Sequence, residues 1–78
     1  AIKLPLTISL DSWEYKKISN FENILDEMDL VFSYEISKFD NKIIYYKLIY
    51  NGGPNKFIND IKEKGIELDT QKQTWKIK

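Results

Sequence analysis

The side chains of this chain that could do chemistry are lysines, carboxylates and aromatic rings. Histidine and cysteine are absent, and all 12 basic residues are lysines, which balance the 12 acidic residues. Proton transfer near neutral pH most often uses histidine, and bidentate phosphate binding uses the arginine guanidinium. A chain without net positive charge also lacks the field that attracts nucleic acid. The composition therefore predicts a non-enzymatic protein with no cofactor and no nucleic-acid partner.

One group of carboxylates has the spacing of a shared helix face. Glu22, Asp26 and Asp29 lie at positions i, i+4 and i+7, near the predicted end of a helix. The helix dipole disfavours negative charge at that end. The ordinary interpretation is a solvated helix end, and the alternative is a low-affinity site for a divalent cation or a basic partner.

The stretch YNGGPNKF has the composition of some phosphate-binding loops. In a P-loop a glycine directly precedes the lysine, whereas Asn55 precedes Lys56 here. Pro54 also lacks the backbone N–H that an anion at a helix start requires. We therefore expect a turn in which Gly52 and Gly53 supply backbone freedom between a strand and a helix.

Hydrophobic periodicity predicts the elements that would position these residues. Apolar and polar side chains alternate over residues 4–10, which indicates a strand with one buried face. An apolar stripe with three- and four-residue spacing predicts a helix over about residues 12–28. Asp11 and Glu14 have the spacing of a capping box, so we expect Asp11 to cap this helix.

A hairpin and a second helix are expected in the middle of the chain. The β-branched and aromatic runs 30–36 and 43–50 are separated by turn-favouring residues around Asp40. A short helix is predicted to begin at Pro54 and to stop at Gly65.

The C-terminal residues predict one more strand or hairpin, and the two tryptophans have two possible roles. Ile66 and Leu68, then Trp75 and Ile77, indicate a last strand or a short hairpin. Trp13 and Trp75 could stack on a ligand, but large aromatic residues of this kind are more typical of lids on a core.

The order strand, helix, strand, strand, helix, strand predicts the α+β class. The expected arrangement is the ferredoxin-like split βαβ (βαββαβ), with a four-stranded antiparallel sheet and two helices on one face. A chain of 78 residues supports one core, so residues 1–78 are interpreted as a single domain. Because the sequence starts without methionine or a signal peptide, we interpret it as a piece excised from a longer protein. No stretch approaches the roughly 20 apolar residues of a membrane span, so no membrane insertion by this segment is expected.

The hairpin loop decides which side chains lie on the open face of the sheet. A three-residue loop places eight residues under the helices: Leu30, Phe32, Tyr34, Ile36, Ile44, Tyr46, Leu48 and Tyr50. It leaves Val31, Ile43, Tyr45 and Ile49 on the other face, as an apolar patch rimmed by polar groups. Scattered apolar residues on an open sheet are one interpretation of this patch. The other is a surface on which the parent chain or a second copy docks.

Two ligand-binding classes remain as alternatives. Tyr45 beside Lys47 is compatible with the base-stacking strand of an RNA-recognition domain, although the run lacks the expected glycine and phenylalanine. Amino-acid-binding regulatory domains carry a glycine loop after the first strand, which is absent from Leu10-Asp11-Ser12. The main interpretation is an interaction module, and the alternative is a small-ligand-binding regulatory domain.

Three short runs of the sequence resemble those of a known family: Asp11-Ser12-Trp13, Leu48-Ile49-Tyr50-Asn51-Gly52 and Trp75-Lys76-Ile77. The family is the C-terminal module, a domain of unknown function, of uncharacterised Gram-negative bacterial envelope proteins. Lysine and isoleucine stand here where that family usually has arginine, alanine and valine. The resemblance implies a ferredoxin-like accessory module of an exported protein, in the periplasm or cell envelope, with no catalytic residues to carry over.

Overall fold

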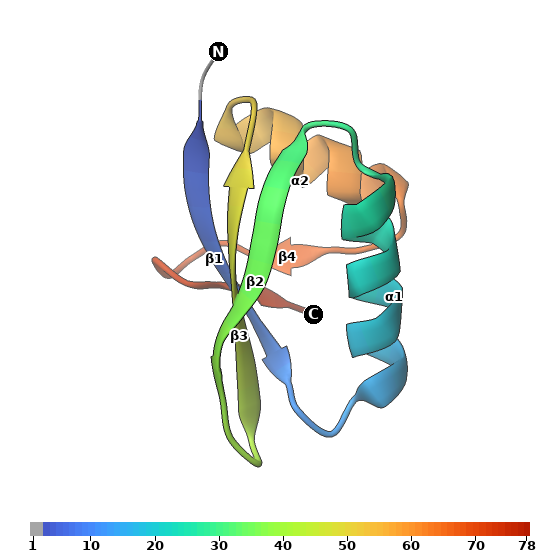
Figure 1. Cartoon of the computed structure of the whole chain (residues 1–78), viewed down its shortest axis with the longest axis vertical. Helices are drawn as coiled ribbons and strands as arrows, with labels where there is room; N and C mark the ends of the chain where they lie inside the picture. The colour runs from blue at the N-terminus through green and yellow to red at the C-terminus, as the bar shows by residue number, and fades with distance from the viewer. Residues whose placement is uncertain (1–2) are drawn as a thin grey trace.

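The computed structural model describes residues 3–78, which form a sheet with helices beside it (Figure 1). Its elements are β1 (Leu4–Asp11), α1 (Tyr15–Glu27), β2 (Val31–Phe39), β3 (Ile43–Tyr50), α2 (Pro54–Glu63), β4 (Leu68–Asp69) and β5 (Trp75–Ile77). The α+β class is thereby confirmed. None of the helices in this part of the chain is long and apolar enough to cross a membrane.

The sheet has five strands in the order β2-β3-β1-β5-β4 across residues 3–78, and it is mixed. β3 pairs antiparallel with both β2 and β1, β4 pairs antiparallel with β5, and β5 runs parallel to β1. The expectation of four purely antiparallel strands is therefore wrong. The polar residues 70–74 turn the chain back after β4. The strand that follows, β5, therefore runs opposite to β4 and parallel to β1. Of the two alternatives for the C-terminal residues, the short hairpin is the one that forms.

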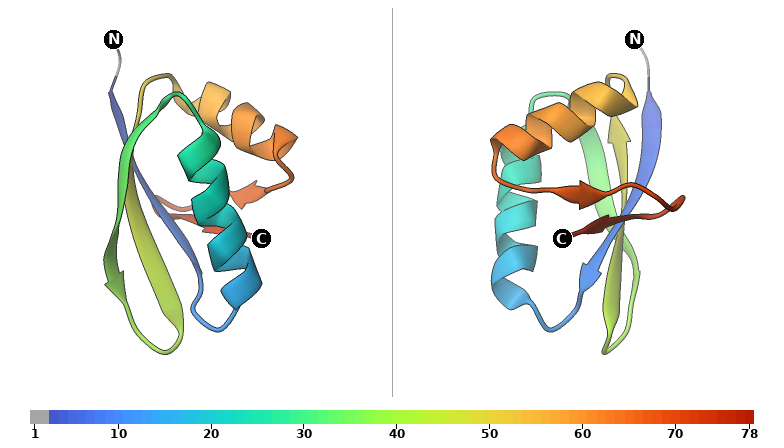
Figure 2. Two further views of the ribbon diagram at one scale, coloured as in Figure 1. Left: turned by 45° about the vertical axis from the view of Figure 1, so that its right-hand side comes forward. Right: turned by 180° about the vertical axis from the view of Figure 1, so that it is seen from behind.

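Both helices cover the same face of the sheet (Figure 2). Their apolar stripes and the inward side chains of the strands form one core. Its largest fully buried side chains are Tyr46, Tyr50, Phe21, Phe57, Ile8, Leu10, Leu25, Leu48 and Ile61. Phe21 and Leu25 of α1 and Phe57 and Ile61 of α2 are among these nine residues, so each helix buries one apolar stripe against the sheet.

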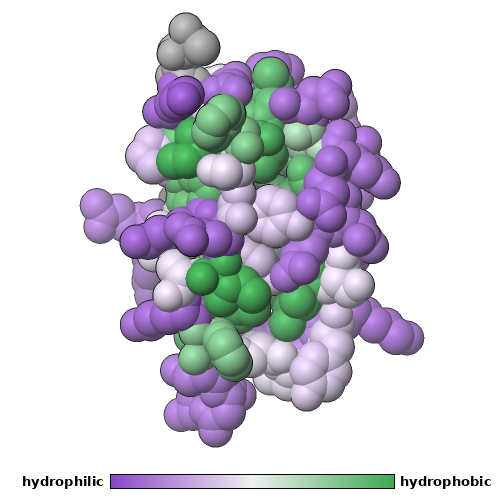
Figure 3. All heavy atoms as spheres, viewed as in Figure 1, coloured by the Kyte–Doolittle hydropathy of each residue, from purple (hydrophilic) through white to green (hydrophobic). Residues whose placement is uncertain are grey.

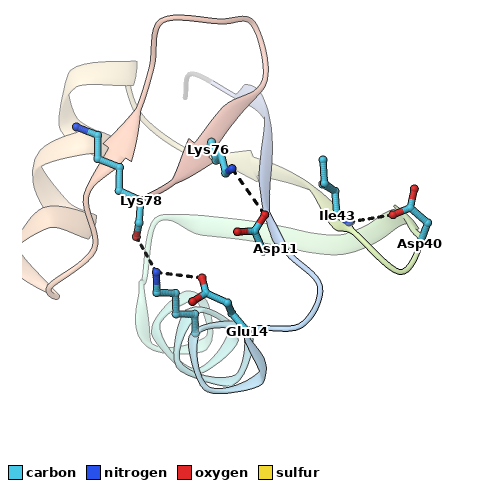
Figure 4. A network of polar contacts seen from close by, with 7 residues as sticks. Asp11, Glu14, Asp40, Ile43, Lys76 and Lys78 are labelled. Atoms are coloured by element: carbon cyan, nitrogen blue, oxygen red, sulfur yellow. Dashed lines mark hydrogen bonds and ion pairs between the residues drawn. The ribbon is translucent and has the colours of Figure 1, made fainter.

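The predicted capping box at the start of α1 is wrong. The helix begins at Tyr15, and its N-cap Glu14 makes no side-chain hydrogen bond to the helix. Asp11 is still part of β1, where it pairs with Ile43, and its carboxylate lies 3.7 Å from the Nζ of Lys76 (Figure 4). Continued pairing with β3 keeps Asp11 extended and delays the helix.

Residues 40–42 connect β2 to β3, but the predicted three-residue register is wrong next to the turn, because Phe39 pairs with Ile44 and the N–H of Asp40 donates to the carbonyl of Ile43 at 3.0 Å. A register shift between Ile36 and Lys38 restores the predicted pairing of Ile36 with Tyr46. The Oδ1 of Asp40 accepts hydrogen bonds from the N–H of Lys42 at 2.8 Å and from that of Ile43 at 2.9 Å. These two donors hold the pKa of the Asp40 carboxyl below its usual value. The side chain of Asp40 thus closes the turn.

The glycine pair forms the expected turn between β3 and α2, but for a different reason. Gly53 has a φ of −79°, and Gly65 is the glycine with positive φ in the described chain. A Cβ on Gly52 would lie 2.8 Å from Cε2 of Tyr50. The prediction of backbone freedom is therefore wrong for this pair, and Gly52 instead leaves room for the buried ring of Tyr50.

Candidate functional site

Three members of the predicted patch lie on the open face of the sheet, opposite the helices. Ile43, Tyr45 and Ile49 are half-buried and alternate with buried residues of β3. In the register with β1, Tyr45 lies opposite Ser9 and Ile49 lies opposite Pro5. We call Ile43, Tyr45 and Ile49 the open-face patch.

Val31 is not part of this patch, and Phe32 is not under the helices. Val31 pairs with Tyr50 and packs against the core, whereas Ser33 pairs with Ile49. The register shifts between Val31 and Ser33, so a β-bulge reverses the expected side-chain alternation at this end of β2. Phe32 is 61% exposed, and the Nζ of Lys3 lies 4.3 Å from its ring centroid.

A hollow of about 790 Å³ lies beside the open-face patch. Its wall is the connection between β4 and β5, which projects past β1 on the side away from the helices (Figure 2). The side chains of the open face that line it are Pro5, Thr7, Ser33, Glu35, Lys47 and Ile49, and the wall adds Gln73 and Thr74. Ile49 therefore belongs to both the patch and the hollow.

The lining of the hollow includes hydrogen-bonding and charged side chains. Lys47 lies directly opposite Glu35 on β2 and Thr7 on β1, so a cation, a carboxylate and a hydroxyl stand in one row. Neither Lys47 nor Glu35 takes part in the ion pairs formed by residues 3–78. The volume of the hollow lies within the range of small-molecule pockets, roughly 300–1,000 Å³.

On the other face, two of the candidate metal-binding carboxylates bind tyrosines. The hydroxyl of Tyr46 donates a hydrogen bond to Glu22, and that of Tyr34 donates to Asp26 at 2.6 Å. Asp29 follows the end of α1 and lines a separate acidic hollow with Glu27 and other residues. Within residues 3–78, no group of three or more histidine, cysteine or acidic side chains is arranged to hold a metal ion. The structure therefore does not bring the three carboxylates together.

A third tyrosine forms the same type of contact with α2. The hydroxyl of Tyr50 donates to Asp60 at 2.6 Å, and this hydrogen bond holds the pKa of Asp60 below its usual value. Burial raises the pKa of Tyr46 and Tyr50 strongly, and the hydrogen bond to Asp26 raises the pKa of Tyr34 to about 12. Sequence reasoning missed these contacts, although tyrosines on the inner face of β3 opposite acidic helix positions were a visible signal.

The two tryptophans differ in environment. Trp75 packs against the core, with its ring centroid 6.4 Å from that of Phe57, so the prediction of a core lid is confirmed for it. Trp13 is 65% exposed, and the same prediction is wrong there. Because α1 begins two residues after Trp13, this side chain is not on the apolar stripe of the helix.

Comparisons with known proteins identified no relative of this chain. No protein-family model, no curated protein and no solved structure matches the chain.

Proposed function

We propose that this domain is a non-enzymatic interaction module that binds another protein through the open face of its sheet. The observation that carries the proposal is the placement of Ile43, Tyr45 and Ile49 on the face that neither helix covers. Apolar side chains rimmed by polar groups are typical of docking surfaces. The absence of histidine and cysteine supports the non-enzymatic part of the proposal.

The charges of the open face favour a second copy of the chain as the partner. Glu35 and Lys47 lie directly opposite each other on β2 and β3. If a two-fold axis passed between Glu35 and Lys47, Glu35 of each copy would face Lys47 of the other copy. The experiment must distinguish this partner from a neighbouring domain of a longer bacterial protein, which could cover the same face.

A ferredoxin-like relationship and an envelope location complete the proposal. The antiparallel order β2-β3-β1, with both helices on one side, matches three strands of the split βαβ arrangement. The β4–β5 hairpin stands where that arrangement has its fourth strand. The family resemblance of the sequence supports an accessory role within a larger exported protein of the periplasm or cell envelope.

The double substitution Tyr45→Ser with Ile43→Thr tests the use of this face. Both side chains are only half-buried, so the free energy of unfolding should change by less than about 1 kcal/mol. Sedimentation equilibrium should show weaker self-association than in the wild type. The control Phe39→Ser removes an exposed ring from the helix side of β2 and should leave this association unchanged.

Two results would count against the proposal in different ways. A wild-type protein that stays monomeric at millimolar concentration would exclude the second copy and leave the neighbouring domain as the partner. Equal association of the double variant and the wild type would show that the open face is not the contact.

A small-ligand-binding regulatory domain is the second candidate, and the hollow is the observation that favours it. A thermal-shift screen against amino acids, nucleotides and divalent metals separates the two, because a ligand at 100 times its Kd adds roughly 2.7 kcal/mol of stability. A hit from a ligand with a carboxylate or phosphate should be lost in Lys47→Gln, whose charge lies in the hollow, and kept in Lys62→Gln on α2. A screen without any shift would favour the protein partner.

A further inference from the structure

One end of the molecule carries large exposed apolar side chains that the open face does not include. Trp13 is 65% exposed, Tyr15 78%, Phe39 72% and Ile36 47%. We call these four residues the end patch. None of them lines the hollow on the open face.

Two connections of the chain bring the end patch together. The N–H of Ser12 donates to the carbonyl of Lys42 at 2.9 Å, and its Oγ donates to the carbonyl of Asp40 at 2.7 Å. Trp13 follows Ser12 and Phe39 precedes Asp40, so both rings leave the backbone next to these hydrogen bonds. Figure 1 places the β1–α1 and β2–β3 connections at the same end of the long axis, and the views of Figure 2 agree.

The register places the rest of the patch on the helix side of the sheet. Ile36 pairs with Tyr46 and Phe39 pairs with Ile44, both of which belong to the core. Figure 3 shows apolar side chains over the lower part of β2, next to paler residues at the foot of α1. Trp13 in the β1–α1 connection, Tyr15 at the start of α1, and Ile36 and Phe39 near the end of β2 therefore share one end of the molecule.

The carboxylates and the lysines around this end differ in how many of them form ion pairs or hydrogen bonds. Each of its carboxylates has a partner: Asp11 lies near Lys76, Glu14 near Lys17, and Asp40 accepts backbone N–H groups of its own turn (Figure 4). Lys16, Lys38 and Lys42 take part in none of the ion pairs formed by residues 3–78. Lys38 and Lys42 lie near the Asp40 carboxylate, whose pKa they help to lower, and the Nζ of Lys38 lies over the Tyr45 ring. This end therefore presents exposed aromatic rings together with more lysines (Lys16, Lys17, Lys38, Lys42 and Lys76) than carboxylates (Asp11, Glu14 and Asp40).

We propose that the end patch docks the domain on an anionic lipid surface. Tryptophan and tyrosine favour the boundary between headgroups and acyl chains, and lysines near the surface are attracted by anionic lipids. The rings lie in or directly beside two adjacent connections at the end of a molecule measuring 36 × 23 × 21 Å, which suits a fluid surface that can deform around them. A second copy seated patch to patch would bring like-charged lysines together, which opposes that contact.

This docking is shallow and differs from spanning the bilayer. Only the side chains in and beside the two connections would enter the interface, while the helices stay packed on the sheet. The hydrogen bonds of Ser12 hold the two connections together before binding, so little ordering is needed. The open face remains free for the protein partner proposed above.

Vesicle binding tests this inference directly. The full chain is mixed with vesicles of phosphatidylcholine and phosphatidylglycerol in equal parts, and with vesicles of phosphatidylcholine alone. Cosedimentation should occur with the anionic vesicles, and raised salt should weaken it because the lysine attraction is screened. The double substitution Trp13→Ser with Phe39→Ser should lower the partition coefficient by about tenfold or more. Lys16→Gln with Lys42→Gln should lower it by several-fold on the anionic vesicles only.

Two further variants separate docking from loss of folding or from another contact. Trp13→Phe keeps an apolar ring, so it should still cosediment but lack the blue shift of tryptophan emission that we expect of the wild type on vesicles. Tyr45→Ser with Ile43→Thr, on the open face, should bind vesicles as the wild type does. No binding to the anionic vesicles, or equal binding by Trp13→Ser with Phe39→Ser, would overturn the proposal. Self-association abolished by the end-patch variant, without vesicle binding, would assign the patch to a protein contact instead.

Discussion

Tyr45 and Tyr46 are neighbours in β3, and their surroundings show how the two faces of the sheet differ. Tyr46 is fully buried on the helix side, where its hydroxyl donates to Glu22 and its ring packs edge-on against Phe21 at 5.2 Å. Tyr45 is half-buried on the open face, where the Nζ of Lys38 lies 5.1 Å from its ring centroid. The helix side gives the hydroxyls of Tyr34, Tyr46 and Tyr50 internal partners, and the open face leaves apolar and charged groups available for a partner molecule.

The largest expected difference between the faces concerns the core under α1. Phe21 and Leu25 are almost fully buried, so truncating either to alanine leaves a cavity. The free energy of unfolding should fall by roughly 2 to 5 kcal/mol, a large share for a domain of this size. Urea denaturation measures this loss, with Ile49→Ala on the open face as the control that should lose less. A loss below about 0.5 kcal/mol for Phe21→Ala would contradict the packing of α1 described above.

The glycine pair gives a second comparison, between a crowded and an open position. Alanine at position 52 would place its Cβ 2.8 Å from the Tyr50 ring, which is held by Asp60 and by edge-on packing against Phe57 at 5.0 Å. Gly52→Ala should therefore cost about 1 to 3 kcal/mol of unfolding free energy. Gly53→Ala meets no atom within 4 Å and has an ordinary φ, so the lower freedom of the unfolded chain favours it, whereas alanine is a poorer N-cap for α2 than glycine. Its unfolding free energy should therefore change by less than about 1 kcal/mol. Equal thermal midpoints for the two variants would refute the steric role of Gly52.

The sequence predicted the inner face of β3 but not the ends of the sheet. Alternation over residues 43–50 was a local signal, and Tyr46 was placed correctly under the helices with Tyr45 on the open face. The predicted register of residues 34–36 with β3 is correct, but it results from a shift between Ile36 and Lys38 and not from the length of the loop. The bulge at Phe32 has no local signal, because it arises from how β2 meets its partner strand. Val31 was therefore assigned to the wrong face.

The hollow and the end patch could not be predicted for a related reason. The wall of the hollow needs β5 to lie parallel to β1, which depends on where residues 70–74 reverse the chain. Trp13 was expected to be a core lid because the helix was expected to begin at residue 12. The delayed start follows from the pairing of Asp11 with Ile43, a contact between residues far apart in the sequence.

The tyrosine hydroxyls of β3 give a third and smaller difference. Tyr46→Phe removes the donor to Glu22, whose carboxylate is half-buried and regains only part of its solvation from water. The expected loss of unfolding free energy is about 1 to 2 kcal/mol. Tyr45→Phe changes a hydroxyl on the open face and should lose less than about 0.5 kcal/mol. Both values come from urea titration at neutral pH, and equal losses would mean that the contact with Glu22 adds nothing to stability.

The smallest effect is a dependence of stability on acid pH that belongs to the helix side alone. The hydrogen bond from Tyr50, together with Lys56 at 3.4 Å, holds the pKa of Asp60 below its ordinary 3.8. A carboxyl with a lowered pKa in the folded state contributes stability that is complete above its unfolded pKa. That contribution is lost as the pH falls below about 3.8 and passes through the lower, folded pKa.

The difference in unfolding free energy between the wild type and Asp60→Asn should therefore be constant near neutral pH and shrink as the pH is lowered toward about 3. Tyr50→Phe removes the principal cause of the lowered pKa, so the same comparison made in that background should change less over this range. Tyr45→Phe serves as the control from the open face, because its ring lies beside Lys38 rather than a carboxylate. Its difference from the wild type should not follow the titration of Asp60. A difference between wild type and Asp60→Asn that stayed unchanged down to pH 3 would show that the hydrogen bond from Tyr50 does not favour the ionised carboxylate.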